Sequence, residues 1–111
     1  MEFTVRELEQ GIAVVRGAGR LNMVSAGQLR ELVAASVAGG SSRIIVDLSA
    51  VEFIDSSGLG ALVNGLKIAR QAGGDLRISA PTDQVKLVLQ LTNMERVLYP
   101  YPTVESAYAN D

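Results

Sequence analysis

IVDLSAVEFIDSSGLG, residues 45–60, contains the most informative change of pattern in this chain. Its apolar first half predicts a β-strand, whose leading part we place at 43–48. Apolar residues then recur at spacings of three and four, as on one face of a helix, at Leu59, Leu62, Val63 and Leu66. The segment therefore predicts a strand followed closely by a helix, with Asp55, Ser56 and Ser57 at the junction.

This serine junction can serve structure or function. The first N–H groups of a helix have no partner within the helix, so they can donate to a capping oxygen or to an added phosphate. Asp55 or a neighbouring serine is therefore either a helix cap or part of a regulatory site. Both interpretations fit the same residues.

The residues before the junction predict a strand pair and a helix. Strands are expected from Phe3 to Leu8 and from Ile12 to Gly17, with a turn at Gln10-Gly11. Ser25 followed by Gln28 has the pattern of a capping box at the start of a helix. The apolar face of that helix, which ends at a pair of glycines, comprises Leu29, Leu32, Val33, Ser36 and Val37.

The residues after the junction helix predict two further strands and two helical segments. A half-buried strand is expected at 75–79, after a glycine pair that ends the junction helix. The next helix begins near Pro81-Thr82-Asp83, where Thr82 can act as the cap. A short strand from Arg96 to Tyr99 and a final helical segment from Thr103 to Ala109 complete the chain.

Strands that alternate with helices of this length imply right-handed parallel crossovers. We therefore expect an α/β fold with one mixed, mostly parallel sheet of about five strands. It consists of an N-terminal strand pair followed by β-α-β-α-β, with the helices packed on the sheet. A chain of 111 residues with 48% hydrophobic content is expected to form one domain, 1–111.

The charge balance argues against two classes of partner. Ten basic and twelve acidic residues give a net charge of −2, and there is no run of Lys or Arg, so direct binding of nucleic acid is not expected. No apolar run approaches the about 18 residues of a membrane span. The chain lacks cysteine, and its charged N-terminus interrupts any signal-peptide core, so we expect a cytoplasmic protein without disulfides.

The composition also argues against an enzyme. Without histidine or cysteine there is no Ser-His-Asp triad, no Cys-His pair and no imidazole metal site, so Ser56 has no evident base. Asp47 and Asp55 could bind Mg²⁺, but a helix cap and a loop residue are the favoured interpretation. Gly58 and Gly60 lack the third glycine of a dinucleotide-binding motif. No cofactor or metal is expected.

Taken together, these motifs resemble a known family. The segment 45–60, the sequence Gly19-Arg20-Leu21-Asn22 before the first helix, the glycine pair 73–74 and the Pro81 turn resemble the pattern of STAS domains. Within that superfamily the chain is most similar to the anti-sigma factor antagonists. The resemblance covers nearly the whole chain, and the serine junction is its most specific part.

This resemblance implies a regulatory switch. In the family the first serine after the aspartate accepts a phosphate, a role that passes to Ser56 and not to Ser57. The implied partner is an anti-sigma factor with serine-kinase activity. The unmodified antagonist binds it and frees a sigma factor, phosphorylation breaks the complex, and a serine phosphatase restores it.

The partner-binding surface is expected to surround the junction. Its candidate residues are Asp55, Ser57, Gly58, Leu59, Arg20, Asn22, Met23 and Val24. Core packing is slightly favoured for Leu59, and partner contact for Met23 and Val24.

Two residues before the first predicted helix depart from the family pattern. The antagonists usually carry acidic residues where this chain has Arg20 and Asn22, in what we expect to be a loop facing the kinase. One interpretation is an anti-sigma factor of complementary charge. The alternative is a STAS module that does not switch, acting as a scaffold or as a ligand-sensing regulatory module.

Overall fold

The structure, a computed structural model, describes residues 1–8 and 11–109. Its strands are β1 (Glu2–Leu8), β2 (Ile12–Leu21), β3 (Arg43–Ile54), β4 (Asp75–Ser79) and β5 (Pro100–Tyr101). Its helices are α1 (Ala26–Ala38), α2 (Ser56–Gln71) and α3 (Asp83–Leu91), with a short 3-10 helix η1 (Met94–Arg96). Of the predicted turn at Gln10-Gly11, Gln10 lies outside the described residues.

The five strands form one sheet in the order β1-β2-β3-β4-β5. β1 and β2 are antiparallel, and each later strand is parallel to the one before it. The predicted α/β fold with a mixed, mostly parallel sheet is therefore confirmed.

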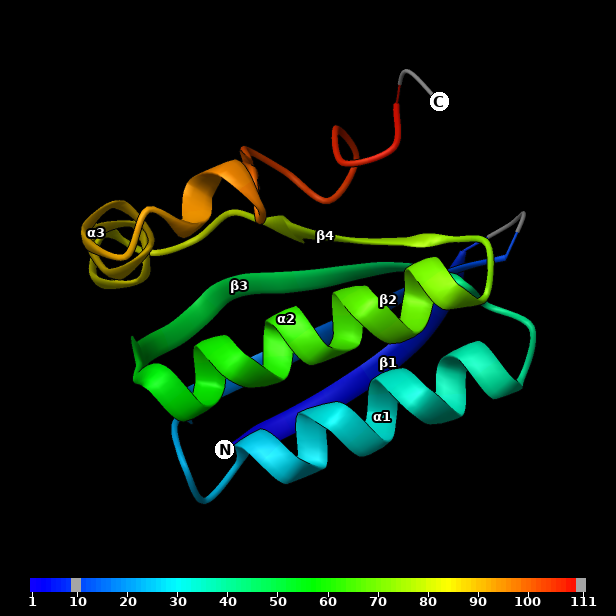
Figure 1. Cartoon of the computed structure of the whole chain (residues 1–111), viewed down its shortest axis with the longest axis horizontal. Helices are drawn as coiled ribbons and strands as arrows, with labels where there is room; N and C mark the ends of the chain where they lie inside the picture. The colour runs from blue at the N-terminus through cyan, green and yellow to red at the C-terminus, as the bar shows by residue number, and fades with distance from the viewer. Residues whose placement is uncertain (9–10, 110–111) are drawn as a thin grey trace.

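The main core lies between the sheet and its helices. α1 and α2 run side by side in front of the strands, and α3 lies past the end of β4, beside the later part of β3 (Figure 1). Alternate residues of β2, β3 and β4 face these helices, among them Val15, Ile44, Val46, Leu76 and Ile78, all buried. From α2, Leu59, Leu62 and Leu66 meet them, as the helical spacing predicts.

The opposite face of the sheet is crossed by the C-terminal segment. The hydroxyl of Tyr108 lies 2.9 Å from the carbonyl oxygen of Asp75 and 3.1 Å from that of Ile44, so it can donate to either. The guanidinium of Arg77 lies 4.2 Å from the centre of the Tyr108 ring and donates to the Ala107 carbonyl oxygen at 2.7 Å. These contacts fix the end of the chain against β3 and β4.

The predicted helix at 103–109 is wrong, because this segment forms turns. The Ser106 hydroxyl accepts from the Thr103 N–H at 3.2 Å, and the Thr103 hydroxyl accepts from the Ser106 N–H at 3.1 Å. Such local side-chain bonds compete with the backbone bonds of a helix.

The last strand also differs from the prediction. Residues 94–96 form η1, and the strand follows at Pro100–Tyr101 rather than at Arg96 to Tyr99. The N–H groups of Val97 and Leu98 both donate to the Met94 carbonyl oxygen, at 3.0 and 2.8 Å, which keeps the segment coiled. The chain extends only at residue 100, where it reaches β4.

β2 and β3 are longer than predicted. β2 continues past Gly17 to Leu21, where Leu21 pairs with Ile54 of β3. Gly19, with a φ of 116°, lies at one of two irregularities in this pairing. Arg20 therefore lies in a strand and not in the loop where it was expected.

The helices begin where predicted, but two of the three proposed caps are wrong. Ser25 makes no capping bond; its hydroxyl donates to the Arg20 carbonyl oxygen at 2.8 Å and accepts from the Asn22 N–H at 3.0 Å. Thr82 donates to the Val51 carbonyl oxygen at 2.8 Å, which ties the start of α3 to β3. The Ser25 hydroxyl thus bonds to the end of β2 and the Thr82 hydroxyl to β3, and neither bonds to its own helix.

Candidate functional site

Asp55 is the centre of the serine junction. Its backbone is extended, and its Oδ1 accepts from the Gly58 N–H at 2.9 Å, which confirms the interpretation of Asp55 as the cap of α2. Its Oδ2 accepts from the Met23 N–H at 3.2 Å, in the loop between β2 and α1. One carboxylate thus joins the start of α2 to the loop 22–24.

The two serines of the junction differ in exposure. Ser56, the first residue of α2, is exposed, whereas Ser57 is half-buried. Neither hydroxyl has a hydrogen-bond partner within the described part of the chain. Ser56 therefore presents a free hydroxyl to solvent at the N-terminus of a helix, where a phosphate would be locally favoured.

Gly58 and Leu59 face the interior. A Cβ at Gly58 would overlap the Leu21 carbonyl oxygen, so the absence of a side chain allows α2 to approach β2 closely. Leu59 is only 9% exposed and belongs to the main core. Of the candidate partner-binding residues, these two therefore fix the start of α2 against the core instead of lying on the surface.

The loop 22–24 presents an exposed apolar surface. Met23 is 76% exposed and Val24 is 88% exposed. The Asn22 side chain accepts from the Val24 N–H at 3.0 Å, which shapes the loop from within. The loop therefore carries two adjacent apolar side chains that the domain itself does not bury.

Arg20 lies beside this loop, at the second-last position of the strand β2. Its guanidinium carbon is 4.2 Å from the centre of the Phe53 ring, a cation–π contact that orients an exposed side chain. No carboxylate among the described residues lies within ion-pair distance of it. A hollow of which Arg20 is part adjoins the loop, and its other lining residues are Met1, Gly19, Asn22, Val24, Ser25 and Gln28.

The ends of β2 and β3 bring these groups together. The Asp55 N–H donates to the Leu21 carbonyl oxygen at 3.2 Å, directly after the pairing of Leu21 with Ile54. The Ile54 N–H donates to Oε1 of Gln84 on α3 at 3.0 Å. Sequence reasoning missed Gln84, because nothing in its position in the sequence indicates a contact with residue 54.

Asp47 is not part of this arrangement. Its Oδ2 lies 3.8 Å from Nε of Arg16, and its Oδ1 accepts from the Ser49 N–H at 3.0 Å. Residues 1–8 and 11–109 contain no group of three or more acidic side chains placed to hold a metal ion.

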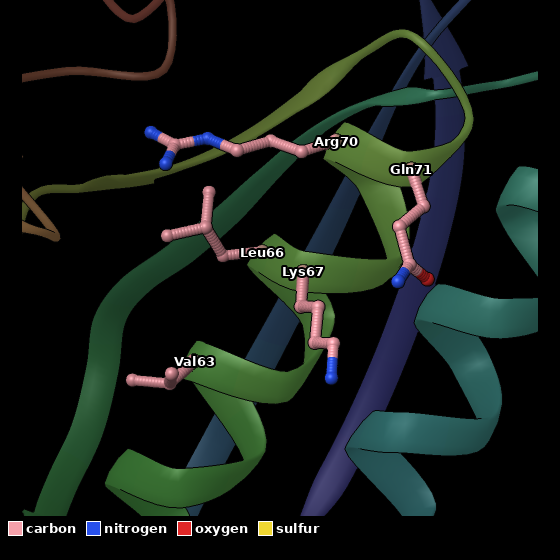
Figure 2. A pocket seen from close by; sticks show the side chains of 5 residues that line it. All are labelled: Val63, Leu66, Lys67, Arg70 and Gln71. Atoms are coloured by element: carbon pink, nitrogen blue, oxygen red, sulfur yellow. The ribbon is translucent and has the colours of Figure 1, made fainter.

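A second hollow lies along the later turns of α2, away from the junction (Figure 2). Val63, Leu66 and Arg70 extend to one side of the helix, and Lys67 and Gln71 to the other. Nε of Arg70 lies 3.2 Å from the Asp75 carboxylate, so its charge is already paired. A single helix lines this hollow.

Comparison with known proteins identifies the fold. Residues 4–107 match the model of the STAS domain, and the chain belongs to that family. It is 41% identical over 68 residues to a proposed anti-sigma factor antagonist of Thermotoga maritima, an alignment that covers 61% of this chain and 60% of that protein. It is 27% identical over 85 residues to an anti-sigma-B factor antagonist of Staphylococcus aureus, covering 77% of this chain and 79% of that one.

Solved structures agree with this assignment. A crystal structure of a proposed antagonist from Thermotoga maritima has a TM-score of 0.87 at 30% identity, covering 96% of this chain and 92% of that chain. The Bacillus protein SpoIIAA shares the fold, with a TM-score of 0.81 at 22% identity in its unphosphorylated form, covering 96% and 92% of the two chains. Its phosphorylated form has a TM-score of 0.75 at 21% identity, covering 97% of each chain.

Two further findings concern enzymatic activity and membrane spans. Anti-sigma factor antagonists of this family are regulatory binding proteins rather than enzymes, in agreement with the prediction from the sequence. Among the helices of the described residues, none combines the length and apolar character needed to cross a membrane.

Proposed function

We propose that this protein is a cytoplasmic anti-sigma factor antagonist, controlled by phosphorylation of Ser56. In the unmodified form it binds an anti-sigma factor with serine-kinase activity and thereby releases a sigma factor. The observation that carries the proposal is the exposed hydroxyl of Ser56 at the first position of α2, which has no hydrogen-bond partner among residues 1–8 and 11–109. The names of the relatives support the partner, and the two solved forms of SpoIIAA support control by phosphate.

The partner surface consists of the loop 22–24 and the groups around Asp55. Met23 and Val24 supply apolar contact, and Arg20, held over Phe53, supplies a fixed positive charge at the edge. Asn22 and Asp55 shape the surface by accepting hydrogen bonds from the Val24 and Met23 N–H groups, and the backbone of Ser57 lies beside them in the first turn of α2. Gly58 and Leu59 contribute indirectly, by fixing the position of α2.

Phosphate at Ser56 would disrupt this surface without unfolding the domain. It adds a charge of about −1.5 to −2 at pH 7 next to the Asp55 carboxylate. The positive end of the α2 dipole stabilises that charge locally, so the fold tolerates it. Binding of a partner against the junction would, however, require desolvation of the phosphate or bring it close to like charges. Both costs weaken the complex, which then dissociates.

The chemistry of the switch comes from other proteins. Among the described residues no side chain lies within hydrogen-bond distance of Ser56 to act as a base. The kinase partner brings ATP, Mg²⁺ and its own base, and a serine phosphatase removes the phosphate.

The test compares four proteins in calorimetric titrations against the kinase-type anti-sigma factor: wild type, Ser56→Ala, Ser56→Asp and the neighbouring control Ser57→Ala. Ser56→Ala should bind and resist phosphorylation, and Ser57→Ala should bind and accept phosphate. Ser56→Asp should bind weakly yet unfold at nearly the same denaturant concentration, because an acid at a helix N-terminus is favourable by about 0.3 to 1 kcal/mol.

Equal affinities for wild type, Ser56→Ala and Ser56→Asp would reject the switch. Phosphate located on Ser57 by mass spectrometry would reject Ser56 as its site.

A further inference from the structure

β1 forms one edge of the sheet. In the described part of the chain its only strand neighbour is β2, which it pairs with over all seven of its residues without a bulge. α1 packs against α2, β2 and β3, and in Figure 1 it runs alongside β1 in front of the sheet. β1 contains no proline, and such an edge has main-chain N–H and C=O groups that can pair with another strand.

The side chains of β1 would match those of a second, antiparallel copy of the same strand. Glu2-Phe3-Thr4-Val5-Arg6 has Thr4 at its centre, flanked by apolar residues and then by opposite charges. If two copies pair antiparallel about Thr4, each Glu2 faces Arg6 of the second copy, and each Phe3 faces Val5 of the second copy. Opposite charges, an aromatic residue against a β-branched one, and threonine against threonine are the favourable cross-strand pairs of antiparallel sheets.

The two-fold symmetry of such a pair restricts its register. Residues that face each other across an antiparallel pair lie on the same side of the sheet, so the axis must pass through a residue position. An axis at Val5 would place Phe3 opposite Glu7, and an axis at Arg6 would place two arginines opposite each other. Thr4 is therefore the centre that pairs unlike charges and opposes no like ones.

We propose that β1 is a docking edge for a second copy of this chain, which continues the sheet across a two-fold axis at Thr4. Phe3 and Val5 would then pack together on the helix side, where Val5 is 44% exposed in the single chain. Glu2 and Arg6, both exposed, would pair on the other side. The proposal does not involve Ser56, because Ser56 begins α2 after β3, whereas β1 is the edge strand on the other side of β2.

A charge-reversal cycle tests the register. Sedimentation equilibrium over a concentration series should show a dimer for the wild type. Glu2→Arg and Arg6→Glu each place like charges opposite each other at two positions, and should raise the dissociation constant about tenfold or more. The double variant Glu2→Arg with Arg6→Glu restores the opposite-charge pairs and should return the constant to within about threefold of the wild type. Circular dichroism should be unchanged throughout.

A second experiment reports the geometry directly. The chain has no cysteine, so Thr4→Cys introduces a single thiol, and its partner in the second copy would lie at a Cα separation of about 4.5 to 5.5 Å, within the range of a disulfide. Mild oxidation should link Thr4→Cys into a dimer and leave the exposed β2 control Arg16→Cys unlinked. A monomer at every concentration, single and double charge variants of equal affinity, or equal linking of the two cysteine variants would each overturn the proposal.

Discussion

The Asp55 carboxylate and the Met23 backbone, 32 residues apart in the sequence, are joined by a hydrogen bond of 3.2 Å. The other oxygen of the same carboxylate caps α2 through Gly58 at 2.9 Å. A change at the start of α2 can therefore reach the exposed apolar loop without passing through the core. The Asp55 carboxylate therefore holds both the loop and the start of the helix that carries the proposed phosphorylation site.

Substitution of Asp55 should separate these two roles. Asp55→Asn keeps an acceptor oxygen for the Gly58 N–H but places an amide nitrogen, which cannot accept, opposite the Met23 N–H. Its free energy of unfolding should stay within about 0.5 kcal/mol of the wild type, because Asn and Asp cap helices equally well. Asp55→Ala removes both bonds and should lose about 1 kcal/mol in urea unfolding.

Hydrogen exchange then reports on the loop. The Met23 amide should exchange faster in both variants than in the wild type, while amides in the middle of α2 stay protected in Asp55→Asn. An unchanged Met23 exchange rate in Asp55→Ala would show that Asp55 does not hold the loop.

A pair of glycines on α2 provides a matched test of packing at the junction. Gly58→Ala places a methyl group against the Leu21 carbonyl oxygen, which also accepts from the Asp55 N–H. We expect a loss of about 1 to 3 kcal/mol in the free energy of unfolding from this overpacking. A Cβ at Gly60 would meet no described atom within 4 Å apart from its chain neighbours and the backbone of α2, so Gly60→Ala should stabilise the helix by about 0.5 to 1 kcal/mol.

Urea unfolding of the two variants gives effects of opposite sign if this account is correct. A Gly58→Ala protein as stable as the wild type would mean that α2 can move away from β2 at no cost.

The sequence predicts the junction well because its signals are local. The apolar run before Asp55, the helical spacing after it and the capping carboxylate all lie within one short stretch, and the structure places them as expected. Leu59 is buried, in agreement with its predicted core packing, and Met23 and Val24 are exposed.

The misses concern contacts between distant segments. Ser25 has the sequence of a capping box, but the end of β2 offers its hydroxyl the Arg20 carbonyl oxygen. The length of β2 depends on its pairing with β3, and no pattern within 18–21 records that pairing. Gln84 contacts Ile54 only because α3 packs beside the last residues of β3. Tertiary neighbours select these bonds from several that the local sequence permits.

The C-terminal segment gives a prediction about stability. Tyr108 is buried, and its hydroxyl is within hydrogen-bond distance of carbonyl oxygens of both β3 and β4. Tyr108→Phe should lower the free energy of unfolding by about 0.5 to 1.5 kcal/mol, the usual net value of one hydrogen bond. Its ring can still stack with Arg77, so the loss is confined to the hydroxyl.

The control is Tyr99→Phe, since the Tyr99 side chain is 62% exposed. Denaturant unfolding should show little change for it. Equal losses in the two variants would mean that the Tyr108 hydroxyl does not fasten the segment.

The loop 22–24 gives the prediction that bears most directly on the proposed partner. Val24→Ser removes apolar surface that is exposed in the free protein, so the free energy of unfolding should change by no more than about 0.5 kcal/mol. In the complex the same side chain would be buried, and its loss should weaken binding to the anti-sigma factor about tenfold, since burying a valine contributes about 1.5 kcal/mol or more.

Leu91→Ser is the matched control, because Leu91 on α3 is exposed to a similar extent but lies outside the proposed surface. Calorimetric titration should give nearly wild-type affinity for this variant and the tenfold loss for Val24→Ser. If both variants bind as the wild type does, the loop does not contact the partner. If only Leu91→Ser is impaired, the partner instead binds along α3, and the surface around Met23 and Val24 has been assigned to the wrong face.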